Sequence, residues 1–286
     1  MINQISWMSA SGLSLALIFL PTVAEAEEGV KSHGQAKGRA NTLQRVLKNP
    51  NNPPQVKKPS VKFFISQQAR KRRKPPSDYS RAGGSRGCPG EAIPLTVLAP
   101  NTFVGKTTLV YPTFAWFVAK PQTTEFRLFK LDAKTSIPKR VGGTIEVQSK
   151  SGINKLSLSQ KQAALAVGGT YIWQVSIDCP DGPFIKRAEF EVVQKPSTLD
   201  NRLSKVKNYS QRASIFKQED FWYEALQEAL KTAPQGKLGQ LGSSIVQNLA
   251  LEDNLTPETL TSNRLEALKK EIHQRKKHLE SIAERN

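Results

Sequence analysis

Hydrophobic and polar residues alternate along two segments in the middle of the chain, residues 170–178 and 187–193. Side chains of a β-strand point alternately to opposite faces, so each segment is predicted to be a strand with one buried face. The inward positions are Tyr171, Trp173, Val175 and Ile177 in the first segment and Ala188, Phe190 and Val192 in the second.

Shorter apolar runs separated by turn residues surround these two strands. Turns are indicated by Gly142-Gly143, Ser151-Gly152, Gly168-Gly169 and Pro180-Asp181-Gly182. Seven or eight short strands without a long helix between them are typical of an immunoglobulin-like or fibronectin-like β-sandwich, which we predict for residues 88–195, with Trp116 and Trp173 in its core. The further predicted strands are 93–98, 109–111, 113–118, 126–131, 144–148 and 155–159.

The apolar period changes to a helical one after residue 197, so the fold class is mixed, β followed by α. Residues 197–235 are predicted to form an amphipathic helical hairpin that packs on the sandwich, and residues 236–286 further C-terminal helices. The last helix has apolar residues at heptad spacing, with Arg275 at the one missing seam position. A partner helix could cover this seam, but packing within the chain is the favoured interpretation.

The N-terminus carries the pattern of an export signal. Residues 11–23 form a short apolar run, and Ala24-Glu25-Ala26 is a small-x-small cleavage site. Residues 1–26 contain no Lys or Arg, so an uncleaved N-terminal anchor is the alternative. No later run is long enough to cross a membrane, so the mature chain is expected in the periplasm or outside the cell without a transmembrane segment.

A basic, proline-rich segment follows the predicted signal. The chain of 286 residues has a net charge of +18, and residues 27–87 contribute 15 Lys and Arg against 3 acids. High charge and few apolar residues predict a disordered linker. Its densest run, Arg70, Lys71, Arg72, Arg73 and Lys74, is a candidate site for an anionic polymer, although a plain solvated tether is an equal alternative. Specific nucleic-acid binding is not indicated, because a row of aromatic residues for base stacking is missing.

The two cysteines, Cys88 and Cys179, bracket the predicted sandwich. In an exported protein an even pair favours a disulfide. Two free thiols remain the alternative, and a redox role is weakly indicated because the chain lacks a Cys-x-x-Cys motif.

No cofactor, metal site or catalytic set is predicted. Residues 104–108 look like the end of a phosphate-binding loop, but Pro100 stands where that loop needs glycine and no helix pattern follows. Lys106 is therefore expected in a hairpin loop. Asp178 and Asp181 could serve a glycan-acting enzyme in principle, but a turn after a strand is the simpler interpretation.

One set of segments resembles a known family. It comprises Arg81–Cys88, Pro112–Phe117, Glu125-Phe126, Gly169–Trp173, Cys179 and Trp222–Leu226. In order and spacing over residues 80–235 it is similar to the domain-of-unknown-function family 928, exported proteins found mainly in cyanobacteria. The resemblance implies architecture and compartment but no catalytic residue, since this family has no established activity.

These observations together predict an exported, non-enzymatic interaction or scaffold module that meets an envelope protein or an anionic polymer. The alternatives are an enzyme that acts on envelope glycans and a protein dedicated to binding anionic polymers.

Overall fold

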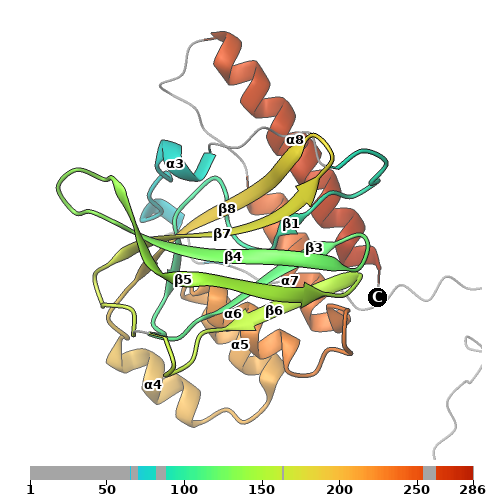
Figure 1. The fold of residues 1–286 in the computed structure, drawn as a ribbon. Coiled ribbons are helices and arrows are strands. Elements are labelled where there is room, and N and C mark those ends of the chain that lie inside the picture. Colours follow the sequence, from blue (N-terminus) through green and yellow to red (C-terminus); the bar gives the residue numbers. More distant parts are fainter. Residues whose placement is uncertain (1–64, 66–69, 82–87, 163, 254–261, 286) are drawn as a thin grey trace, which may run out of the picture. The chain divides into compact units, whose positions relative to one another are not determined.

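The structure is a computed structural model that describes residues 65, 70–81, 88–162, 164–253 and 262–285 (Figure 1). All of them belong to the second of two units, Lys58–Asn286. The predicted signal at 1–26 and most of the predicted linker at 27–87 lie outside the described residues.

Two β-sheets form the first half of the described unit. The larger sheet has the order β2-β8-β7-β4-β5, and the smaller has the order β1-β3-β6. Every pairing is antiparallel except that of β2 with β8, which is parallel. The strands are β1 (Thr96–Val97), β2 (Gly105–Thr107), β3 (Thr113–Val118), β4 (Gln122–Leu131), β5 (Pro138–Ser149), β6 (Gly152–Ser157), β7 (Thr170–Cys179) and β8 (Gly182–Val192).

The two sheets meet through an aromatic core. The ring of Phe114 in β3 lies 5.1 Å from Phe126 in β4, 5.0 Å from Trp173 in β7 and 5.4 Å from Phe190 in β8. Rings at these separations attract one another beyond the burial of their area. Trp116 is fully buried as expected, and its indole Nε1 donates to Ser149 Oγ at 3.2 Å.

The sheet order shows which strand predictions hold. Residues 113–118 and 170–178 are strands as predicted. The single buried face expected for 170–178 is wrong, because Ile172, Gln174 and Ser176 on its other face are buried as well. Residues 109–111 are not a strand. The expectation of a hairpin loop for Lys106 is also wrong, because Lys106 lies in β2 opposite Glu191 of β8.

The second half of the described chain is helical, with α5, α6 and α7 behind the strands in Figure 1 and α8 as the long red helix. The bounds are α4 (Ser197–Ser204), α5 (Tyr209–Gln218), α6 (Trp222–Leu230), α7 (Gly239–Glu252) and α8 (Ser262–Glu284). Residues 197–235 hold three helices, α4, α5 and α6, and not the two predicted, because the first predicted helix, from Leu199 to Ala213, is divided between α4 and α5. The break occurs because the Asn208 side chain accepts hydrogen bonds from the backbone N–H groups of Ser210 and Gln211 and so starts a new helix.

Helix α8 packs within the chain, since Leu279, Ile282 and Ala283 are buried in the common core. The favoured interpretation of its heptad pattern is thus confirmed. Before the sheets, residues 70–80, here called the strap, lead into the short helix α3 (Asp78–Arg81) and lie against the outer face of β8. The Ser77 backbone N–H and hydroxyl both donate to Glu189 Oε2, at 2.8 and 2.6 Å. The strap therefore belongs to the folded unit, although the sequence assigns it to a disordered linker.

Candidate anion-binding pocket

The basic run predicted to bind anions is divided between buried and exposed positions. Arg70, Lys71 and Arg72 are exposed, whereas the Arg73 side chain is only 11% exposed. Lys74 is exposed but pairs with Glu191, Nζ to Oε2 at 3.0 Å. Arg73 is held by acids of the same chain and is not available to a polymer, so anion binding by this run stays a prediction that depends on the exposed residues.

Arg73 belongs to a buried cluster of two cations and two carboxylates. Its guanidinium donates to Asp220 through Nε at 3.2 Å and Nη2 at 2.7 Å, and to Glu252 Oε2 at 3.0 Å. Lys217 Nζ donates to the same Glu252 oxygen at 2.7 Å. Burial opposes the charge on Arg73, but the two carboxylates outweigh it and raise the pKa of Arg73. The cluster fastens the strap to α7 and to the turn between α5 and α6.

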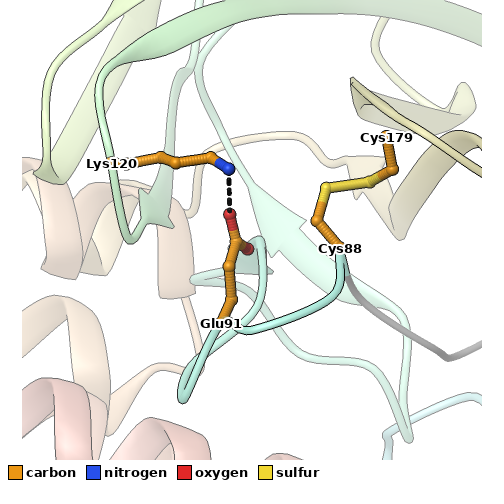
Figure 2. Close-up of a disulfide and its surroundings, with 4 residues drawn as sticks. All are labelled: Cys88, Glu91, Lys120 and Cys179. Atoms are coloured by element: carbon orange, nitrogen blue, oxygen red, sulfur yellow. Dashed lines mark ion pairs between the residues drawn. A yellow bond between two sulfur atoms is a disulfide. The ribbon is translucent and has the colours of Figure 1, made fainter.

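The disulfide predicted as the favoured state of the cysteines is present (Figure 2). Cys88 and Cys179 are separated by 91 positions in the sequence, and their Cα atoms lie 5.3 Å apart. The bond ties the segment before β1 to the end of β7. Beside it, Glu91 Oε1 lies 3.7 Å from Lys120 Nζ.

The predicted carboxylate pair of a glycan-acting enzyme lies at the β7–β8 hairpin. Asp178 and Asp181 are both exposed, and Asp178 pairs in register with Pro183. This is the place of the turn that the sequence pattern favoured.

A second group of basic residues, which the sequence reasoning missed, surrounds a small cavity. Strand β8 supplies Lys186 and Arg187 to its wall, and helix α8 supplies Glu271, Gln274, Arg275 and His278. The cavity has a volume of about 50 Å³, enough for a few water molecules or one group of carboxylate or phosphate size. Glu271 is the one carboxylate among the lining residues, and a second carboxylate, that of Asp253, pairs with Arg275 from outside the lining.

Arg275 is the fixed part of this pocket. Its Nε donates to Asp253 Oδ2 at 2.8 Å, and its terminal nitrogens donate to the carbonyl oxygens of Val97 and Ala99 at 3.3 and 2.6 Å. The polar residue that interrupts the apolar seam of α8 therefore anchors that helix to the chain around β1. Asp253 also accepts from Thr102, so the anchor is rigid.

Lys186 and His278 are the lining residues of this pocket whose side chains are not fixed by hydrogen bonds to described residues. Among the residues that the structure describes, neither makes a hydrogen bond or an ion pair within 4.0 Å, although the Lys186 ammonium lies 5.0 Å from the ring centre of Phe184. Burial lowers the pKa of both groups, and the charge of Arg275 lowers each further. Glu271 offsets only part of this effect at Lys186. The charges of Lys186 and Arg275 thus repel one another across the pocket, and an anion beside Lys186 and His278 would relieve that repulsion.

Two larger hollows are present as well. One of about 700 Å³ lies between the strap and the β4–β5 turn, where Lys139 already pairs with Asp132 at 2.9 Å. One of about 270 Å³ lies between β6 and the turn after α6, and it is lined by Lys150, Lys155 and Lys237 without a carboxylate. These three lysines are exposed to solvent, whereas Lys186 and His278 of the small pocket are half-buried, so water balances the charge of the larger hollow more effectively.

The segment Trp222–Leu226, one of those that resemble the family, performs a structural task. Trp222 Nε1 donates to the Leu98 carbonyl at 3.0 Å, and Tyr223 OH accepts from Trp173 Nε1 at 3.0 Å. Glu224 Oε1 accepts from the Thr108 backbone N–H at 2.5 Å and from its hydroxyl at 2.8 Å. Burial raises the pKa of Glu224. These side chains join α6 to both sheets.

Two basic segments of the sequence contribute to the pocket. Residues 269–278 hold five Lys and Arg, two His and one acid, although they fit the pattern of a coiled-coil-like helix. Lys186-Arg187 is a second basic pair inside a predicted strand. Only tertiary structure brings the two together.

In the ranges that the structure describes, no helix is long and apolar enough to cross a membrane. Within the same ranges, no group of three or more His, Cys, Asp and Glu residues is placed to hold a metal ion. Two sheets, a covering layer of helices and one disulfide define a mixed β and α domain that carries a basic pocket.

The chain belongs to the family described as Domain of Unknown Function (DUF928), whose model matches residues 81–256. The family resemblance in the sequence is thereby confirmed, and the match extends beyond residue 235 to include α7. No curated protein matches the chain. Lys186 and Arg187 lie inside the matched range, whereas Arg275 and His278 lie beyond it.

Proposed function

We propose that this protein is an exported, non-enzymatic interaction module that binds an anionic group of an envelope or extracellular component. The observation that carries the proposal is the pocket between β8 and α8, where the half-buried Lys186 and His278 lie beside Arg275 and only one lining residue, Glu271, is a carboxylate. A positive, partly desolvated cavity favours a ligand that brings negative charge. The two sheets, as a variant of an immunoglobulin-like or fibronectin-like sandwich, would serve as the rigid scaffold for it.

Export is supported by two independent features. Residues 1–26 have the pattern of a signal peptide. The Cys88–Cys179 bond suits an oxidising compartment such as the periplasm or the medium. Mass measurement of the protein recovered outside the cytoplasm tests both features, because the expected species starts at Glu27 and lacks two thiol protons.

Calorimetric titration of the exported chain with inorganic phosphate, sulfate and galacturonate tests the binding proposal. We expect saturable binding of at least one of them, weakened at least tenfold in the double variant Lys186→Gln/His278→Gln. The matched control is Lys205→Gln/Lys207→Gln, which removes two exposed lysines after α4 that line none of these three hollows. Equal binding by the pocket variant and the wild-type protein, or no binding of any of the three anions, would refute the proposal.

A glycan-turnover assay on the same preparation tests the non-enzymatic part. Hydrolysis that Asp178→Asn abolishes would support the enzyme alternative instead.

A further inference from the structure

The outer face of α8 next to the pocket is also basic. Lys270, His273 and Lys277 are exposed and lie three and four positions apart, so they share one face of the helix. Lys270 and Lys277 are about 10 Å apart along the helix axis. We name these three side chains the rim residues.

The rim residues continue into the pocket. Gln274, which lines the cavity, is four positions after Lys270 and three before Lys277, so it is a surface neighbour of both. A ligand that places one anionic group beside Lys186 and His278 therefore has further positive charge along α8. A single small anion in a cavity of about 50 Å³ would leave this charge unused.

On this basis we infer that the ligand is a linear acidic polysaccharide that places one anionic group in the pocket and runs along the rim residues of α8. The inference rests on the proposed function and specifies its ligand class. The shared chemistry is a repeating carboxylate or sulfate on a sugar chain, and the test below separates these two sources.

A polysaccharide fits the surroundings better than a nucleic acid does. The exposed aromatic side chains of the described chain are Tyr79 and Tyr209. The backbone of Tyr79 is next to the pocket, because its carbonyl accepts from Arg187 at 3.2 Å and the following residue, Ser80, lines the cavity. One ring suffices to pack on the apolar face of a sugar. Single strands of nucleic acid bind instead through several rings on which successive bases stack.

The test is a length series titrated into the exported chain: galacturonate, its trimer and decamer, a sulfated decamer, and a single-stranded oligonucleotide of the same charge as the decamer. We expect affinity to rise at least tenfold from monomer to decamer, and to fall with salt more steeply for the decamer. Whichever decamer binds more tightly identifies the anionic group. An oligonucleotide that binds as tightly as the better decamer would overturn the assignment to polysaccharide.

The variant Lys270→Gln/Lys277→Gln separates this inference from the proposed function. It should weaken decamer binding about tenfold and flatten its salt dependence while leaving monomer binding within twofold. The control Lys205→Gln/Lys207→Gln removes the same charge from exposed positions outside the three hollows and should change neither. If monomer and decamer bind equally and the rim variant has no effect, the polymer inference fails while the pocket stands. Loss of monomer binding only in the pocket variant supports the proposed function independently.

Discussion

Replacing Arg73 with alanine tests whether the strap is a structural part of the folded unit. The change removes every hydrogen bond of the Asp220 carboxylate that involves described residues and leaves that carboxylate only 5% exposed. Glu252 keeps its bond to Lys217 at 2.7 Å, so one carboxylate rather than two loses its partner. Breaking a buried pair from one side costs about 3–5 kcal/mol, and the surviving bond places this case near 3 kcal/mol.

The assay is urea unfolding of the exported chain, with thermal unfolding as a second measurement. A loss of about 3 kcal/mol corresponds to a Tm lower by about 6–12 °C for a unit of this size. Arg72→Ala is the matched control, because that neighbouring side chain is exposed and should change stability by less than about 0.5 kcal/mol.

A second substitution checks the cause. Asp220→Asn in the Arg73→Ala background removes the unpaired charge and should recover part of the loss. Asparagine tolerates the left-handed backbone at this position, where φ is +64°. If Arg73→Ala costs less than about 1 kcal/mol, or if Asp220→Asn lowers stability further, the strap does not dock through this buried pair.

Three other predictions concern the disulfide and two buried side chains of the core. Replacing both Cys88 and Cys179 with alanine should lower the free energy of unfolding by up to about 4.6 kcal/mol, because the bond closes a loop of 91 positions; urea unfolding measures this, and an unchanged midpoint would contradict it. Tyr223→Phe removes the acceptor of the buried Trp173 indole N–H and should cost about 1–3 kcal/mol by the same assay, with unchanged stability as the contrary result. Burial raises the pKa of Glu224, so the folded state holds its proton more tightly, and stability is full below the ordinary Glu pKa and falls as pH rises through the raised value. Glu224→Gln should flatten that decline in a pH series of unfolding curves, and an equally steep decline in the variant would show that another group causes it.

The sequence pattern predicted where the strands at 113–118 and 170–178 lie. It did not predict that both faces of each strand are buried, because the second face is covered by segments far away in the sequence. Strand β2 has only three residues and exists because it pairs in parallel with β8, about 85 positions later, which no local period reports.

The roles of the charged residues could not be predicted either, because their partners are also far away in the sequence. Arg73 stands in a run that looks solvated, and its partners Asp220 and Glu252 are 147 and 179 positions away. Arg275 looked like a defect in an apolar seam, yet it binds Asp253 and two carbonyl oxygens. Lys186 and His278 come together only when α8 docks beside β8.

The distribution of acids inside the fold sharpens the meaning of the net charge. Five acidic residues are buried among the described residues, against one buried base, Lys217. The acids are Glu189, Asp220, Glu224, Glu228 and Asp253. Three of these acids, Asp220, Glu228 and Asp253, pair with Arg73, Arg212 and Arg275, so they cancel positive charge that is itself partly covered. The sequence places two thirds of the +18 in the segment before the sheets, and the folded body adds a separate basic pocket where β8 meets α8. The polyanion binding proposed for this pocket does not invoke the exposed cations of the strap, so removing Arg70, Lys71 and Arg72 and removing the pocket cations are tests of two different sites.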